Sequence, residues 1–245
     1  MRLALHRRSA PTRVSTTPAP TPPPAPTRRR WALLAGLLLS FVGPWVLFIN
    51  IAEDIWESGG FVGDVTILRW EHAHATPALD RLAVGLSTVG GPGPMLGLAA
   101  ALLAGFWLGG RRRAAGLFAL AVGGAMLLNL AVKLAFGRPR PTLWVSILPA
   151  TYYSFPSGHA MGSAAVAAAL GFLLAGWRGR WALWLGGAAF ALGVGWSRVY
   201  LGVHYPSDVL AGWVGSLGWV GGLHLLFSPA LKQLRAWGRR LVVSG

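Results

Sequence analysis

The sequence lacks cysteine and is poor in charged residues, above all in acidic ones. The absence of cysteine from the 245 residues excludes disulfides, thiol chemistry and any cysteine-based metal site. Charged residues make up 12% of the chain, whereas soluble domains carry about 25%. Only seven residues are acidic against 22 basic ones, and 54% are hydrophobic. This composition predicts an integral membrane protein.

The first 30 residues form a segment of a different kind. They are rich in Arg, Pro, Thr and Ser, contain no acidic residue and cannot supply a hydrophobic core. We therefore expect residues 1–30 to be a disordered, basic, Pro-rich cytoplasmic tail, with an organelle transit peptide as the remaining alternative. Residues 31–230 are expected to form one membrane domain, and residues 231–245 a basic cytoplasmic tail.

Six apolar stretches follow one another within the membrane domain. They cover residues 31–52, 84–109, 114–134, 159–176, 181–196 and 208–227. About 20 helical residues cross a hydrocarbon core of about 30 Å, and the fourth and fifth stretches are somewhat short by this measure. The segment 53–83 mixes apolar and acidic residues and predicts short helices lying along the membrane interface. The expected fold is all-α and polytopic, with six transmembrane helices.

Basic and acidic residues separate to opposite sides of the predicted membrane. With a cytoplasmic N-terminus, the inner segments hold 16 of the 22 Lys and Arg residues, while the seven acidic residues lie outside or at the outer boundary. This positive-inside pattern accounts for the net charge of +15 without nucleic-acid binding. We expect a protein of a bacterial inner (plasma) membrane with both termini in the cytoplasm. The sequence predicts no oligomeric state.

Residues that can bind an anion gather at the outer ends of the predicted spans. Lys133, Arg140 and Arg198 supply positive charge, and charged residues at membrane depth usually face a site or a partner. Ser157 and Gly158 open the fourth span, where free backbone N–H groups and the helix dipole favour an anion. These residue types suit a phosphate and the negative charge that develops during its transfer. We therefore predict that these five residues bind a substrate phosphate.

Two histidines and one aspartate remain for proton transfer and covalent chemistry. His204 and Asp208 are four residues apart at the start of the last span, so the carboxylate can hold the imidazole in one tautomer and raise its nucleophilicity. His159 is then free to act as the general acid toward the leaving oxygen. The predicted catalytic residues are His204, His159 and Asp208.

The same residues form three motifs, which are Lys133-(six residues)-Arg140-Pro141, Pro156-Ser157-Gly158-His159 and Ser197-Arg198-(five residues)-His204-(three residues)-Asp208. Their types, spacing and order resemble the three-part signature of the type 2 phosphatidic acid phosphatase superfamily, and the six-span layout resembles its membrane-bound branch. The resemblance implies a phosphohistidine on His204, oriented by Asp208, with His159 as general acid. It also implies catalysis without metal or cofactor, on substrates such as phosphatidate, phosphatidylglycerol phosphate or a polyprenyl pyrophosphate.

Hydrolysis of a lipid phosphate or pyrophosphate at the outer membrane face is thus the leading hypothesis. Two alternatives stay open. The first is a lipid phosphotransferase that uses the same phosphohistidine, and the second is a membrane binding protein without turnover.

A few polar residues fall outside these assignments. Arg138 is left surplus by the spacing of Lys133 and Arg140, and it either anchors the chain at the membrane interface or belongs to the site. His72 and His74 form a His-x-His pair that can bind a divalent ion, although a solvated surface is the favoured interpretation in this outer loop.

Overall fold

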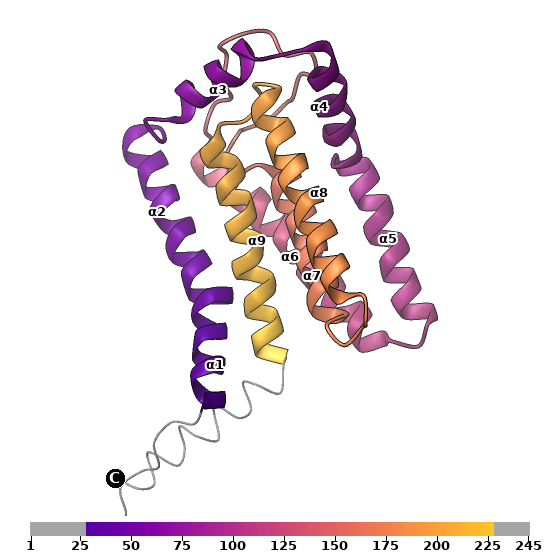
Figure 1. Cartoon of the computed structure of the whole chain (residues 1–245). Coiled ribbons are helices and arrows are strands. Elements are labelled where there is room, and N and C mark those ends of the chain that lie inside the picture. The colour runs from indigo at the N-terminus through magenta and orange to yellow at the C-terminus, as the bar shows by residue number, and fades with distance from the viewer. Residues whose placement is uncertain (1–27, 228–245) are drawn as a thin grey trace, which may run out of the picture.

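The computed structural model describes residues 28–227, and all of its regular elements are helices (Figure 1). Of the predicted tail 1–30, residues 1–27 are outside the described residues. All of the predicted tail 231–245 is outside them as well. The first helix begins at Arg28, ahead of the expected start of the first span at residue 31. The all-helical fold class is confirmed.

The helices run back and forth along one axis (Figure 1). They are α1 (Arg28–Leu37), the π-helix η1 (Leu38–Val42), α2 (Gly43–Ser58), α3 (Asp64–Ala73), α4 (Pro77–Val89), α5 (Pro92–Leu108), α6 (Arg112–Phe136), α7 (Gly158–Leu173), α8 (Arg180–Tyr200) and α9 (Pro206–Phe227). The first pass combines α1, η1 and α2, the second combines α4 and α5, and the last four helices make one pass each. Helix α3 runs across one end of the bundle, and the described chain begins and ends at the opposite end.

Three stretches of the described chain are long and apolar enough to cross a membrane. They are Leu34–Ser58, Arg112–Phe136 and Pro206–Phe227, and the α4–α5 pair counts as a fourth if its bend of 47° lies within one span. The bend falls where Pro92 starts α5 without a backbone N–H, so two helices share the predicted span 84–109. Helix α7 has 16 residues and is about 24 Å long, which is shorter than a hydrocarbon core. The predicted six spans therefore remain a prediction.

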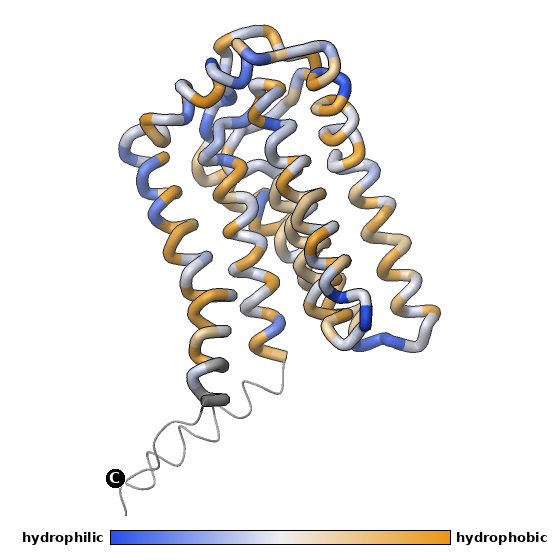
Figure 2. The backbone as a smooth tube through the Cα atoms, viewed as in Figure 1, coloured by the Kyte–Doolittle hydropathy of each residue, from blue (hydrophilic) through white to orange (hydrophobic). Residues whose placement is uncertain are grey.

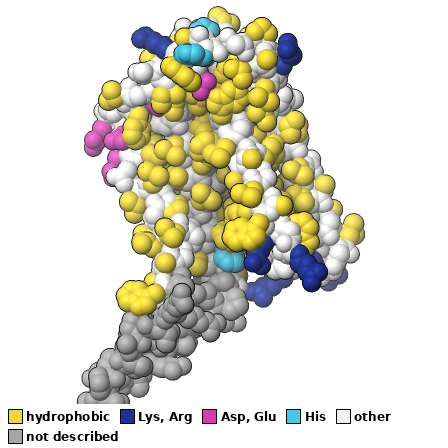
Figure 3. Space-filling view, viewed as in Figure 1, with side chains coloured by type: hydrophobic (Ala, Val, Ile, Leu, Met, Phe, Trp, Pro, Cys, Tyr) yellow, Lys and Arg dark blue, Asp and Glu magenta, His cyan; other side chains and the backbone are white. Residues whose placement is uncertain are grey.

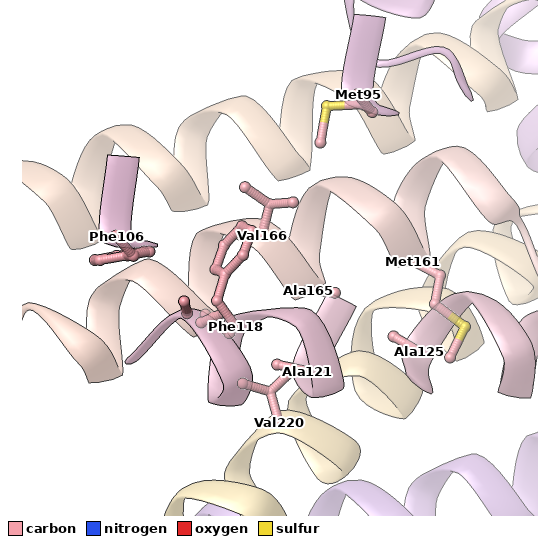
Figure 4. Close-up of a cluster of buried hydrophobic side chains, with 12 residues drawn as sticks. Met95, Phe106, Phe118, Ala121, Ala125, Met161, Ala165, Val166 and Val220 are labelled. Atoms are coloured by element: carbon pink, nitrogen blue, oxygen red, sulfur yellow. The ribbon is translucent and has the colours of Figure 1, made fainter. Parts of the chain in front are cut away.

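Small residues form the contacts around α7, which packs against α6, α8 and α9. Its buried positions are mostly Ala, Gly and Ser, and side chains such as Phe106, Phe118 and Met161 complete the core cluster (Figure 4). Large apolar residues lie outside, where Leu127 and Leu185 are each 70% exposed. Figure 2 shows apolar residues along the helices, with the most hydrophilic stretches near the two ends. Small residues inside and leucines outside are typical of helices packed in lipid.

Helices α6, α7 and α9 are joined where α7 begins. Nδ2 of Asn129 in α6 donates a hydrogen bond to the carbonyl of Pro156 at 3.1 Å. The backbone N–H of Ser157 donates to the carbonyl of Asp208 at 3.0 Å. Gly212 permits this close approach, because a Cβ there would lie 2.8 Å from the carbonyl oxygen of Ser157. The starts of α7 and α9 are thereby fixed against each other.

The two ends of the bundle differ in charge. The α5–α6 and α7–α8 turns, at the end opposite α3, carry exposed Arg residues, and Lys and Arg side chains gather there in Figure 3. Three exposed acidic residues occupy the end of α2 that leads to α3, namely Glu53, Asp54 and Glu57. The α3 end also carries basic residues, namely the exposed Arg69 and Arg81 and, in the motifs, Lys133, Arg138, Arg140 and Arg198. Within the described chain, the two ends therefore differ more clearly in their acidic residues than in their basic ones.

Candidate active site

The three motifs meet at the end of the bundle that α3 covers. All eight residues predicted for the site lie at helix ends or in connections, namely Lys133 in α6, Arg140 in the α6–α7 loop, Ser157, Gly158 and His159 at the start of α7, Arg198 in α8, His204 in the α8–α9 turn and Asp208 in α9. Contacts or charge interactions link five of the other residues to His204, namely Lys133, Arg140, His159, Arg198 and Asp208. The backbone N–H of Ser157 donates to the carbonyl of Asp208. The structure therefore brings together residues from four helices and two connections.

His204 and Asp208 form a buried pair. Nδ1 of His204 lies 3.3 Å from Oδ2 of Asp208, and the two side chains are 2% and 0% exposed. On the other side of the ring, Nη1 of Arg140 lies 3.0 Å from Nε2. A guanidinium only donates hydrogen bonds, so Nε2 is the accepting nitrogen and Nδ1 carries the proton that Asp208 accepts. His204 is thus held in the tautomer whose Nε2 lone pair faces the cations of the site.

Lys133 and Arg140 bind the backbone of the α6–α7 loop. Helix α6 ends because Gly137 adopts the left-handed conformation, with φ at 57°. Nζ of Lys133 donates to the carbonyl of Tyr153 at 2.8 Å, and Nη2 of Arg140 donates to that of Thr151 at 2.8 Å. Neither cation forms an ion pair with an acidic side chain in the described residues. Their positive charge therefore remains available to an anion.

Two buried polar atoms at the site have no hydrogen-bond partner. Within residues 28–227, these unpartnered side-chain atoms are Oγ of Ser157 and Nε of Arg198. Ser157 is 0% exposed and Arg198 is 3% exposed, while Nη1 of Arg198 donates to Oγ of Ser87 in α4. A buried polar group without a partner costs about 1–3 kcal/mol. Both atoms belong to residues of the predicted site, and each can donate a hydrogen bond to an acceptor oxygen such as that of a phosphate.

His159 lies on the side of the site that α4 forms. Its ring contacts the backbone of Ser87, and a Cβ on Gly91 would come within 3.6 Å of its Nε2. Ser87 therefore touches both His159 and Arg198. Ser87 was not predicted from the sequence, because α4 lies outside all three motifs. The available signal was the pair Ser87 and Thr88, which are the two polar side chains of the predicted span 84–109.

The surroundings of His204 keep its imidazole neutral. Burial, and then the positive charges of Arg140, Arg198 and Lys133, hold the pKa of His204 well below its ordinary value of 6.5. Each of these influences disfavours the imidazolium form. A neutral His204 retains the lone pair that a nucleophile requires.

Arg138 is buried beside Asp208 and does not anchor the chain at the membrane interface. It is 6% exposed, its Nη1 donates to Oδ1 of Asp208 at 2.6 Å, and its Nη2 donates to Oδ2 of Asp64 at 2.9 Å. The interface-anchor alternative is therefore wrong. Arg138 binds Oδ1 of Asp208, whereas His204 faces Oδ2, so Arg138 and His204 occupy different sides of this carboxylate. The pairing with Asp64 spans 74 positions, so no local pattern in the sequence predicts it.

His72 and His74 contact tryptophans. The ring of His72 stacks on Trp144 with centroids 4.1 Å apart, and Nδ1 of His74 lies 2.8 Å from the carbonyl oxygen of Trp70. Both histidines are exposed. No group of three His, Asp or Glu side chains between residues 28 and 227 is arranged to hold a metal ion. The arrangement agrees with a solvated surface.

The low pKa of His204 predicts a specific loss of stability in acid. As the pH falls below about 6.5, His204 binds a proton in the unfolded chain but stays neutral in the folded protein. The free energy of unfolding therefore decreases by at most about 1.4 kcal/mol per pH unit. Thermal unfolding in detergent between pH 7.5 and 5.5 should therefore show a steeper decrease for the wild type than for His204→Gln. The exposed variant His74→Gln serves as the control and should keep the wild-type slope. Parallel curves for wild type and His204→Gln contradict the assignment.

Known sequences resemble this chain over the same region. The sequence model of the PAP2 superfamily matches residues 114–231. Phosphatidylglycerophosphatase B of Bacillus subtilis is 31% identical over 182 residues, which cover 72% of this chain and 88% of that protein. An undecaprenyl-diphosphatase of Sulfolobus acidocaldarius is 40% identical over 79 residues, which cover 32% of this chain and 35% of that protein. The chain thus spans about a third of the diphosphatase but most of the phosphatidylglycerophosphatase.

The fold has a solved counterpart. The crystal structure of a transmembrane PAP2-type phosphatidylglycerolphosphate phosphatase from Bacillus subtilis matches with a TM-score of 0.68 and 28% identity. The match covers 77% of this chain and 97% of that one. The phosphatase family expected from the three motifs is thereby confirmed, and this chain belongs to the PAP2 superfamily.

Proposed function

We propose that the protein is a lipid phosphatase that hydrolyses a lipid phosphate or pyrophosphate through a phosphohistidine on His204. The observation that carries this proposal is the environment of Nε2 of His204. This buried nitrogen has its lone pair directed at Arg140, and two buried polar atoms without partners, on Ser157 and Arg198, belong to the same site. A phosphoryl group suits this position, because its oxygens satisfy the donors while its phosphorus meets a nucleophile.

The phosphate-binding residues act mainly through charge. The phosphate oxygens are neutralised by Lys133, Arg140 and Arg198. Hydrogen bonds to them come from the hydroxyl of Ser157 and from the free backbone N–H groups of the first turn of α7, which begins at Gly158. Arg140 shifts its Nη1 hydrogen bond from Nε2 of His204 to a phosphate oxygen, and this shift frees the lone pair for attack. Three cations supply the charge that a metal ion supplies in other phosphatases, so we propose metal-independent catalysis without a cofactor.

The reaction proceeds in two steps. In the first, His159 begins as the imidazolium and His204 as the neutral imidazole. Nε2 of His204 attacks phosphorus, the bond from phosphorus to the leaving oxygen breaks, and His159 gives its extra proton to that oxygen. The charge that forms on the ring of His204 is stabilised by Asp208 through the Nδ1 proton. In the second, a water attacks phosphorus while His159 accepts its proton, the P–N bond breaks and phosphate leaves.

The location of the site supports a membrane substrate. We propose that the six passes of the helical bundle are six membrane crossings, with α3 along the outer interface and the Arg-rich turns in the cytoplasm. The site then lies where lipid headgroups lie. Relatives named for phosphatidylglycerophosphate and for undecaprenyl diphosphate favour testing both a monophosphate and a pyrophosphate.

Phosphate release from lipids tests the proposal directly. Protein purified in mild detergent with excess chelator is assayed on phosphatidate, phosphatidylglycerol phosphate and a polyprenyl pyrophosphate. The wild type should release phosphate from at least one of them, and His204→Ala should lose about 10⁴-fold or more of this activity, because the covalent step has no substitute. The exposed variant His74→Ala is the matched control and should retain full activity.

The outcomes separate the hypotheses. Activity that survives in His204→Ala contradicts the mechanism, and activity that chelator abolishes contradicts its metal independence. Transfer of the phosphoryl group to an added lipid alcohol, with no phosphate released, indicates the phosphotransferase. No reaction in either assay favours the binding protein without turnover.

The absence of cysteine permits a simple test of orientation. Single cysteines are introduced at Val145, which is 93% exposed in the α6–α7 loop, and at Gly176, which is exposed in the α7–α8 turn and where a Cβ would meet no neighbouring side chain within 4 Å. A membrane-impermeant maleimide should label Val145→Cys in intact cells and Gly176→Cys only after the membrane is opened. The reverse labelling pattern contradicts the proposed orientation.

A further inference from the structure

Arg138 uses its guanidinium for contacts within the protein. Nη1 donates to Oδ1 of Asp208 at 2.6 Å and to Oγ of Ser207 at 2.9 Å, and Nη2 donates to Oδ2 of Asp64 at 2.9 Å and to the carbonyl of Gly59 at 2.7 Å. These are the four terminal N–H donors of an arginine. None of them remains for a substrate phosphate, which distinguishes Arg138 from the arginines of the phosphate-binding site.

The surrounding backbone is shaped to hold this guanidinium. Gly60 has a φ of 138°, and a Cβ at this position would collide with Nη2 of Arg138. The ring of Tyr205 covers the other side, with its centroid 4.1 Å from the guanidinium carbon. The turn between α2 and α3 and the start of α9 thus enclose Arg138 from different sides.

Asp64 connects Arg138 to the start of α9. Its Oδ1 accepts the backbone N–H of Ser207 at 3.0 Å, and its Oδ2 accepts the hydroxyl of Ser207 at 2.5 Å. A carboxylate suits this position, because the first turn of a helix presents free N–H groups and a positive dipole end. Asp64 therefore compensates the charge of Arg138 and fixes the turn that precedes Asp208.

The contacts of Asp208 depend on this arrangement. Its Oδ2 accepts the backbone N–H of Tyr205 at 2.9 Å and faces Nδ1 of His204 at 3.3 Å, while its Oδ1 is held by Arg138. Without Arg138, Oδ1 loses its charged partner in a fully buried position. The carboxylate then keeps the N–H of Tyr205, but no charged partner fixes its orientation toward His204, and Arg140 alone opposes a proton on Nε2.

We propose that Arg138, held by Asp64, is a positioning residue that orients Asp208 and thereby fixes His204 in its Nδ1–H tautomer. This inference rests on the proposed function of His204 as the nucleophile. The fork of a guanidinium bridges two carboxylates, which the single ammonium group of a lysine cannot do with the same geometry. Arg138→Lys should therefore be impaired although it keeps the charge.

The experiment compares Arg138→Gln, Arg138→Lys and Asp64→Asn with the wild type. The control is Arg69→Gln, which removes an exposed arginine from the same helix as Asp64. Two kinds of measurement are made on folded, monodisperse protein in detergent. The first is kcat and KM for phosphate release, together with inhibition by inorganic phosphate. The second is the ¹⁵N spectrum of histidine-labelled protein, with the His204 signals identified by their loss in His204→Gln.

We expect kcat of Arg138→Gln to fall about 10- to 100-fold, as for other groups that orient a functional imidazole. KM and inhibition by phosphate should stay within about threefold, because Arg138 does not contact the phosphate-binding residues. The double variant Asp64→Asn/Arg138→Gln should be no slower than Arg138→Gln alone, because an asparagine at position 64 keeps an acceptor oxygen for the N–H of Ser207 and the remaining effect of Asp64 passes through Arg138. The ¹⁵N signals of His204 should show one Nδ1–H tautomer in the wild type and in Arg69→Gln, and a mixture in Arg138→Gln.

The spectrum separates this inference from the proposed function. A mixture of tautomers in Arg138→Gln supports the positioning role even if the wild type releases no phosphate from the tested lipids, an outcome that overturns the proposed activity alone. A single Nδ1–H tautomer in both proteins overturns the positioning role, whether or not the wild type is active. A loss of kcat accompanied by an equal loss of phosphate inhibition also overturns it, because that result indicates a general distortion of the site.

Discussion

One fully buried carboxylate connects the parts of this site. The two oxygens of Asp208 are committed to different partners, Oδ1 to Arg138 at 2.6 Å and Oδ2 to His204 at 3.3 Å. Its backbone carbonyl accepts the N–H of Ser157, so the same residue also fixes the start of α7. A charge buried to this degree is costly unless its lone pairs are satisfied. Asp208 therefore joins His204, which is the proposed nucleophile, to the start of α7 and, through Arg138, to the α2–α3 turn.

The cations of the site divide into two kinds according to their partners. Lys133 and Arg140 are held by backbone carbonyls and form no ion pair within the described chain, so they keep charge for a substrate. Arg138 is neutralised by two carboxylates, and its terminal donors are all in use. This division explains why closely spaced basic residues in one loop serve different purposes. In a membrane protein, each such charge requires either an internal partner or a role toward a ligand.

The gathering of the predicted site residues could be predicted because their spacing follows helix geometry. His204 and Asp208 stand four positions apart at a helix start, and Ser157 precedes another helix start. Their roles toward a phosphate stay a prediction. Asp64 and Ser87 were not predictable, since their contacts join helices that are far apart in the sequence. The all-helical class followed from composition, and the hydropathy pattern indicated a short fourth span, but it did not predict the bend at Pro92.

The central claim is that the phosphoryl group passes through Nε2 of His204. The most direct test mixes the protein with a lipid substrate labelled in its phosphate, stops the reaction within one turnover in alkaline denaturant, where the P–N bond survives, and locates the label by mass spectrometry. We predict a label on the peptide that contains His204 in the wild type, and none in His204→Ala. A label on any other residue, or turnover with no covalent label at any time, contradicts the claim.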